Sequence, residues 1–227
     1  MLPYARPLHG SSPFPLDRGL VLDLPFDDRS GARAYDRSGK GNHGTLSGCT
    51  WVAGRRGSAL SFNGVAAGLH LKLDIFSQAT FMNGATLEAL IRPSSFTAVE
   101  EIIITLEGRI RLRIDPVNTI ACFEQYDGAW KQATDSHTLV ASQVYHLIGT
   151  WDTATNRFYA NAVLGGTTVP SGIGLIDAVS RISTVGINYS TTSEGFPGTI
   201  FRVCVWNRAL TAAEVKRRCE LSLPFMR

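Results

Sequence analysis

The chain has 227 residues, 44% hydrophobic and 18% charged, a balance that supports a folded core and excludes a disordered chain. The formal net charge of +3 at pH 7 is too small to indicate a nucleic-acid partner, and no apolar run is long enough to span a membrane. Four cysteines do not make a disulfide-stapled miniprotein, and the 22 glycines and ten prolines indicate many turns between short strands.

Residues 1–18 differ in composition from the rest of the chain, because they contain four prolines. Proline supplies no backbone N–H and fixes φ, so this segment cannot join a central strand. One interpretation is a disordered leader. The other is an extended arm through which Leu2, Tyr4, Leu8 and Phe14 contact a neighbouring subunit.

From Gly19 onward the sequence consists of short hydrophobic runs separated by turn signals such as Asn63-Gly64 and Asp127-Gly128. We expect strands at residues 20–26, 59–62, 68–73, 85–92, 109–114, 119–126, 144–151, 157–163, 184–187 and 199–206. Many short strands at this spacing predict a sandwich of two sheets.

A single segment has helix signals. Thr211 and Glu214 are three residues apart, as in a capping box, and residues 212–221 contain no glycine or proline. The sequence therefore predicts a short helix near the C-terminus.

Three groups of segments occur along the chain in the order that a known family shows. They are residues 19–27 with the loop DRSGKGNHG at 36–44, residues 57–64 with 86–91, and residues 198–211. Together they resemble the laminin-G-like, concanavalin A-like jelly-roll family. The resemblance implies an all-β, two-sheet antiparallel jelly-roll sandwich with a short C-terminal helix. Together with the proline content of residues 1–18, it divides the chain into a Pro-rich arm at residues 1–18 and a single domain at residues 19–227.

Two departures from the family's pattern bear on function. Where the closing strand of the family usually carries an acidic pair, this chain has Phe201 and Arg202, which weakens a calcium site. Leu90 stands where the family often has a tryptophan, which weakens an aromatic sugar platform. The fold itself serves lectins, hydrolase accessory domains, adhesion modules and virion proteins, so it does not fix the activity.

The loop at residues 36–44 is the densest cluster of polar residues and glycines. Asp36 and Asn42 could supply hard oxygen ligands suited to Ca²⁺, which makes a structural calcium ion the candidate cofactor. The favoured alternative is a loop held by hydrogen bonds, in which Asn42 and His43 satisfy backbone groups.

The most unusual strand is the one predicted at residues 109–114, because alternation places Arg109, Arg111 and Arg113 on one face. Three like charges repel each other unless counter-charges lie nearby. Neighbouring glutamates could neutralise them, and the candidates are Glu88, Glu107 and Glu124. Otherwise the arginines form a row suited to a carboxylate, a sulfate or the acidic surface of another subunit.

Aromatic side chains could stack on sugar rings. Tyr126 and Trp130 flank the Asp127-Gly128 turn and are the aromatic candidates, whereas Trp51, Trp151 and Trp206 are expected to pack in the core or at its edge. The candidate ligand-binding residues are therefore Glu88, Arg109, Arg111, Arg113, Tyr126 and Trp130.

Catalytic patterns are missing from the sequence. The carboxylates are scattered, the five histidines stand in no triad context, and the cysteines lack zinc-site spacing. The four cysteines could form two disulfides, but we expect buried free thiols. No enzyme activity is expected.

The sequence favours a non-catalytic structural protein of a surface or virion, used in decoration or assembly, which self-associates through the arm. The alternative is a lectin-like module that binds a glycan on the concave face or loop rim. Neither a nucleic-acid partner nor a membrane span is expected. No signal peptide is evident, and we expect a location on an extracellular surface or a virion.

Overall fold

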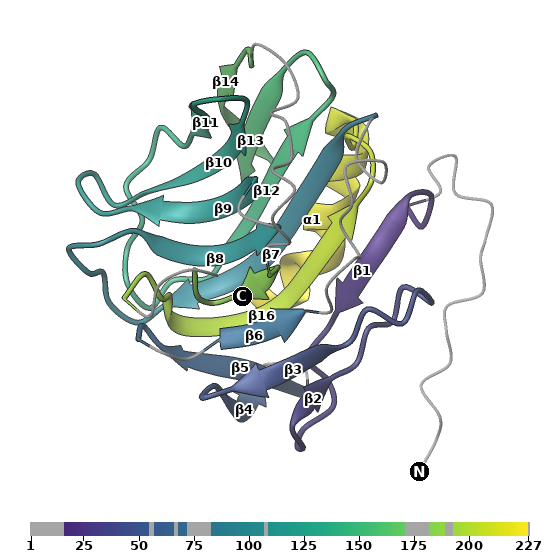
Figure 1. Cartoon of the computed structure of the whole chain (residues 1–227), viewed down its shortest axis with the longest axis vertical. Coiled ribbons are helices and arrows are strands. Elements are labelled where there is room, and N and C mark those ends of the chain that lie inside the picture. Colours follow the sequence, from purple (N-terminus) through teal and green to yellow (C-terminus); the bar gives the residue numbers. More distant parts are fainter. Residues whose placement is uncertain are drawn as a thin grey trace.

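Two antiparallel sheets pack face to face, and a C-terminal helix lies against one of them (Figure 1). The computed structural model describes residues 16–54, 57–65, 68–71, 83–106, 109–170, 182–188 and 193–226. The predicted all-β, two-sheet antiparallel jelly-roll sandwich with a short C-terminal helix is confirmed. The residues proposed as subunit contacts or counter-charges that lie outside the described residues are Leu2, Tyr4, Leu8, Phe14 and Glu107.

Each sheet has eight strands within the described residues. Sheet A contains, in spatial order, β14 (Val163–Thr168), β13 (Asn156–Ala160), β12 (Tyr145–Trp151), β7 (Ala85–Pro93), β16 (Pro197–Trp206), β5 (Gly57–Asn63) and β4 (Thr50–Gly54), with β1 (Leu20–Leu24) paired to β16. Sheet B contains β11 (Trp130–Thr134), β10 (Ile120–Tyr126), β9 (Ile110–Asp115), β8 (Glu101–Leu106), β15 (Thr184–Val185), β6 (Gly68–Leu71), β3 (Gly44–Ser47) and β2 (Arg33–Ala34). Some neighbours are consecutive strands joined as hairpins, as in β11–β10–β9–β8, and others, such as β7 between β12 and β16, are distant in sequence.

The main core lies between the two sheets. Alternation sends Leu87 of β7 and Leu112 of β9 into it, and both side chains are fully buried. Phe123 of β10 packs directly on Gly149 of β12, where an added Cβ would lie 2.0 Å from the ring carbon Cδ2. The two sheets therefore approach closely because residue 149 has no side chain. Trp151 and Trp206 are buried and Trp51 packs partly buried against the core, so the predicted packing roles are confirmed.

Helix α1 (Ala212–Met226) covers the outer face of sheet A, on the side of β7, β12 and β16 away from sheet B (Figure 1). Its predicted capping box is confirmed, since the Glu214 carboxylate accepts the Thr211 N–H and the Thr211 hydroxyl accepts the Glu214 N–H. The helix continues beyond the predicted end at residue 221. Val215 of the helix packs in an apolar cluster with Ile148, Tyr159, Cys204, Trp206 and Leu210. Strand β7 is consequently buried on both faces.

Residues 16–18 are fixed on sheet A. The indole Nε1 of Trp206 donates to the carbonyl of Leu16 at 2.7 Å, and Nε of Arg208 donates to the carbonyl of Arg18 at 2.7 Å. Residues 16–18 therefore lie beside the C-terminal end of β16.

All four cysteines are buried as free thiols. Burial raises the pKa of the Cys122 thiol to about 12, and it also raises the pKa of Cys204. Both thiols are therefore held in the protonated form. Among the described helices, none has the length and apolar character to cross a membrane.

Candidate functional site

The outer face of sheet B carries the predicted row of arginines together with acidic and aromatic side chains. Arg111 of β9 is opposite Glu124 of β10, and Glu124 is opposite Gln132 of β11. Directly opposed residues project to the same face of a sheet, so these side chains are neighbours. We call this set the Arg–Trp face, and it comprises Glu100, Arg109, Arg111, Arg113, Asp115, Glu124, Tyr126, Trp130 and Gln132.

Arg111 lies between two carboxylates. Its Nε donates to Oε2 of Glu124 at 2.5 Å, and its Nη1 is 3.0 Å from Oε2 of Glu100. The side chains of Arg111 and Glu124 are only 10% and 2% exposed, so the pair is largely withdrawn from water. Charge-assisted contacts of this kind fix the plane of the guanidinium.

Arg113 is held in the same way by three acceptors. Its Nη2 donates to Oε1 of Glu124 at 2.8 Å and to Oε1 of Gln132 at 3.1 Å, and its Nη1 donates to Oδ2 of Asp115 at 3.1 Å. Burial alone would lower the pKa of Arg113, but the hydrogen bond and the charge of Glu124 outweigh it and raise this pKa. Glu124 thus supplies the counter-charge for which the sequence made it a candidate.

Two aromatic rings complete the face at the hairpin between β10 and β11. The guanidinium carbon of Arg111 lies 3.9 Å from the centroid of the Trp130 ring, and that of Arg109 lies 4.8 Å from the Tyr126 ring. The two rings meet edge to face, with centroids 5.3 Å apart. Trp130 is nevertheless 38% exposed, so part of the indole surface is open to a ligand.

The structure does not bring Glu88 to the arginines. Expecting Glu88 among their counter-charges was wrong, because β7 belongs to sheet A and Glu88 projects from its outer face, beneath α1. There, Nε of Arg218 donates to Oε2 of Glu88 at 2.7 Å, and Nε2 of His146 lies 2.9 Å from Oε1. Burial alone would raise the pKa of Glu88, but Arg218 and His146 together hold it far below the usual range.

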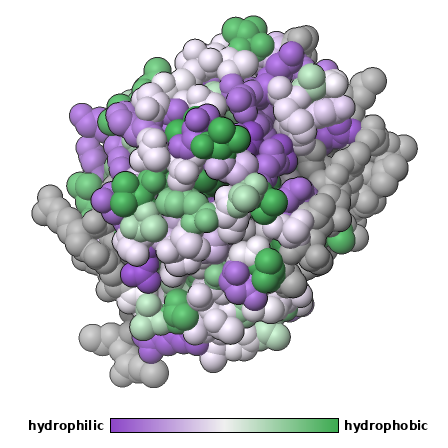
Figure 2. Space-filling model, turned by 90° about the vertical axis from the view of Figure 1, so that its left-hand side faces the viewer, coloured by the Kyte–Doolittle hydropathy of each residue, from purple (hydrophilic) through white to green (hydrophobic). Residues whose placement is uncertain are grey.

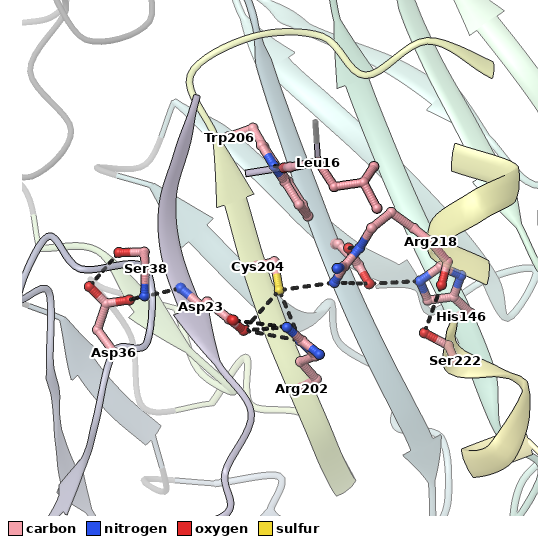
Figure 3. Close-up of polar contacts among 11 residues, drawn as sticks. Leu16, Asp23, Asp36, Ser38, His146, Arg202, Cys204, Trp206, Arg218 and Ser222 are labelled. Carbon is pink, nitrogen blue, oxygen red and sulfur yellow. Dashed lines mark hydrogen bonds and ion pairs between the residues drawn. The ribbon is translucent and has the colours of Figure 1, made fainter. Parts of the chain in front are cut away.

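Glu88 belongs to a second polar network, drawn in Figure 3, which ties α1 to sheet A. Nη2 of Arg218 donates to Sγ of Cys204 at 3.3 Å, and Cys204 is 3.3 Å from Oδ1 of Asp23. Arg202 binds Asp23 through Nε at 3.0 Å and Nη2 at 2.8 Å. The charges of this network are compensated, and burial keeps the Cys204 thiol protonated. The network is therefore suited to holding α1 and β1 on sheet A.

The loop at residues 36–44 is closed by its own hydrogen bonds. Oδ1 of Asp36 accepts the N–H groups of Asp23 and Ser38, both at 2.9 Å. Its Oδ2 accepts the Ser38 hydroxyl at 2.7 Å and the Asn42 N–H at 2.8 Å. The amide of Asn42 donates to the carbonyl of Val21 at 2.7 Å.

These contacts bear on the candidate calcium site. Ca²⁺ binds six to eight oxygen ligands, whereas both oxygens of Asp36 already accept two donors each. In the part of the chain that the structure describes, no group of three or more His, Cys, Asp or Glu side chains is placed to hold a metal ion. The side chains of Asp36 and Asn42 are thus engaged in the hydrogen bonds of the loop, as the favoured alternative expects.

Sequence reasoning missed three members of the Arg–Trp face. Asp115 follows Arg113 by two residues, so the same alternation that exposed the arginines could have identified it. Gln132 could have been found by pairing the hairpin across its Asp-Gly turn. Glu100 had no such signal, because it precedes β8, and β8 has an irregularity between Ile102 and Ile104.

Figure 2 shows the side of the molecule on which β8, β9, β10 and β11 lie in Figure 1. Among its coloured residues, hydrophobic and hydrophilic side chains alternate in small patches, and no broad apolar area is present. A mixed surface of this kind suits a polar ligand better than a large apolar partner.

A family model described as the concanavalin A-like lectin/glucanases superfamily matches residues 63–216. No curated protein matches the chain in sequence.

Several solved structures share the fold at low sequence identity. Domain 4 of AbnA, an extracellular arabinanase from Geobacillus stearothermophilus solved with arabinotriose, has a TM-score of 0.70 and 17% identity, and the match covers 87% of this chain and 97% of that one. The receptor binding domain of botulinum neurotoxin C/D mosaic serotype has a TM-score of 0.69 and 13% identity, with 90% and 52% covered. Trypanosoma rangeli sialidase with the inhibitor DANA has a TM-score of 0.64 and 15% identity, with 87% and 32% covered. The match thus spans about half of the neurotoxin chain and a third of the sialidase chain.

Proposed function

Because the chain belongs to the concanavalin A-like lectin/glucanase superfamily, we propose that it is a non-catalytic, lectin-like module that binds glycans on the Arg–Trp face. The observation that carries the proposal is Trp130, an exposed indole held by the guanidinium of Arg111. A sugar ring presents an apolar C–H face that packs on an aromatic ring, while its hydroxyls bind adjacent polar groups. Gln132 and Glu100 are accessible polar groups on the same face.

The structural neighbours support a glycan as the class of ligand. The matched arabinanase domain was solved with arabinotriose, and the match covers nearly the whole of that domain. Since that arabinanase is described as extracellular, an extracellular location for this chain is part of the proposal.

The contacts of Glu124 support a non-catalytic role. Hydrolysis of a glycosidic bond needs a carboxylic acid that delivers a proton and a second carboxylate placed across the bond. Both oxygens of Glu124 already accept hydrogen bonds from Arg111 and Arg113, so neither is free for that task. The contacts of Glu124 therefore favour binding over cleavage.

The test is a calorimetric titration with oligosaccharides, starting with arabinotriose and extending to a glycan array. Replacing Trp130→Ala is expected to weaken binding by about tenfold or more, which corresponds to about 1.4 kcal/mol. Tyr35→Ala is the matched control, since Tyr35 is an exposed aromatic that lies away from this face. Absence of binding to any glycan, or equal binding by the Trp130→Ala variant, would contradict the proposal.

A second candidate is the structural role in a surface or virion assembly, with self-association through the arm. Its support is that Trp206 and Arg208 hold the backbone of residues 16–18, the last residues of the proposed arm, on sheet A. Deleting residues 1–15 is then expected to lower the oligomer mass in sedimentation velocity while circular dichroism stays unchanged. An unchanged mass would count against the assembly role.

A further inference from the structure

We infer that the Arg–Trp face selects neutral glycans over glycans that carry carboxylate or sulfate groups, an inference that rests on the proposed function. A row of three arginines in sequence points the other way, toward an anionic ligand. The contacts and exposures of the folded protein reverse that expectation.

The charges of the face balance. The cations are Arg109, Arg111 and Arg113, and the anions on the same face are Glu100, Asp115 and Glu124, which pair with Arg111 and Arg113. Three positive and three negative charges leave no net attraction for an anionic ligand at a distance.

The arginines that contact carboxylates also lack a free fork. Recognition of a carboxylate or sulfate by arginine uses two parallel N–H groups. In Arg111, Nε and Nη1 already face Glu124 and Glu100, and in Arg113, both Nη atoms already face carboxylates. An anionic ligand would have to displace one of these carboxylates before it could bind.

Glu100 and Asp115 are more accessible to a ligand than the arginines and Glu124. The side chains of Arg111 and Arg113 are 10% and 6% exposed, whereas those of Glu100 and Asp115 are 33% and 22% exposed. Gln132 and Trp130 are exposed as well. A ligand therefore meets an indole, an amide and two carboxylates, with the guanidiniums beneath them.

This order of groups matches the surface of a neutral sugar. The indole packs on the C–H face, and the amide and carboxylates accept hydrogen bonds from hydroxyl groups. A carboxylate or sulfate on the glycan would instead meet Glu100 and Asp115, and like charges at short distance repel each other. Discrimination here comes from that repulsion as much as from attraction.

The experiment uses a glycan array in which each neutral glycan is printed beside its sialylated, sulfated or uronic acid derivative. The full chain is expected to bind the neutral members at least about tenfold more strongly than their acidic partners in 50 mM NaCl. The difference should narrow in 500 mM NaCl, because salt screens the repulsion between exposed charges.

Glu100→Gln tests the cause. The variant removes the negative charge that faces both the ligand and Nη1 of Arg111, so the ratio of acidic to neutral binding is expected to rise several-fold. Glu220→Gln is the matched control, because Glu220 is an exposed glutamate on α1 that pairs with Arg217, and it should leave the ratio unchanged. Melting temperatures of both variants verify that they fold.

The outcomes separate this inference from the proposed function. Equal or stronger binding of the acidic partners, or no change of the ratio in Glu100→Gln, would overturn the inference and leave the lectin-like role standing. Binding of no glycan on the array would overturn the lectin-like role and this inference together.

Discussion

The guanidinium of Arg111 lies 3.9 Å from the centroid of the Trp130 ring on the outer face of sheet B. A cation over an aromatic ring contributes about 0.5–2 kcal/mol, depending on how far water is excluded. Arg111 is itself fixed by Glu124 and Glu100, so two carboxylates orient the cation and the cation orients the indole. A ring that is already held in place costs a ligand less entropy on binding.

Arg111 is therefore predicted to act as a positioning residue for Trp130. Arg111→Lys keeps the charge but removes the planar group, and we expect glycan affinity to fall by about threefold to tenfold. The indole Nε1–H resonance of Trp130, identified by its absence in Trp130→Phe, should shift in the NMR spectrum. If affinity fell while this resonance did not move, the effect would not arise through the indole.

The ion pair between Glu88 and Arg218 is predicted to hold α1 on sheet A. Glu88→Gln leaves the buried Arg218 without its counter-charge, and loss of one partner of a buried pair costs about 3–5 kcal/mol. The double variant Glu88→Leu/Arg218→Met should recover much of this loss, because neither charge remains buried alone. Urea unfolding of the single and double variants measures both effects, and amide exchange in α1 should rise in Glu88→Gln. Equal stability of Glu88→Gln and the unchanged protein would contradict the role.

Glu101 is predicted to make stability depend on pH near neutrality. Burial raises the pKa of Glu101 to about 7, and among the described residues its Oε2 has no hydrogen-bond partner. In the unfolded chain this group has a pKa near 4.5, so between pH 4.5 and 7 only the folded state binds the proton. The contribution of Glu101 to the free energy of unfolding is therefore fully present below pH 4.5. It is lost as the pH rises to about 7, and the total loss is up to about 3 kcal/mol.

Glu101→Gln imitates the protonated form and tests this sign. The variant should gain stability over the unchanged protein at pH 8, and the gain should vanish near pH 4.5. Urea unfolding at half-unit pH intervals gives the difference directly. A difference that does not vary with pH would show that Glu101 is not the group responsible.

The loop at residues 36–44 is predicted to be stable without calcium. Because Asp36 accepts four hydrogen bonds within the fold, Asp36→Asn is expected to cost about 1–3 kcal/mol with or without Ca²⁺. Addition of Ca²⁺ or of a chelator should leave the melting temperature of the unchanged protein constant. A rise in melting temperature that follows the Ca²⁺ concentration would contradict this account.

Local pattern was enough to predict much of the fold. Alternation located β7 and β9 and assigned the correct face to Arg111 and Arg113, because side-chain direction along a strand depends on sequence parity alone. The capping residues Thr211 and Glu214 located the start of α1 for the same local reason.

What could not be predicted depends on pairing across long distances in sequence. Alternation along the strand predicted which face of β7 carries Glu88, but not which sheet β7 joins. Because β7 pairs with β12 and β16 in sheet A, Glu88 lies under α1. In the same way, the binding of Arg202 to Asp23 depends on the pairing of β1 with β16, two segments at opposite ends of the domain's sequence.

The most direct test of the glycan site is a crystal structure of the protein with the neutral oligosaccharide that binds best on the array. The account predicts a sugar ring packed on the exposed surface of Trp130, with hydroxyl groups in hydrogen-bond contact with Glu100 and Gln132. A sugar bound elsewhere, for example on sheet A or at the loop of residues 36–44, with no sugar on Trp130, would contradict it.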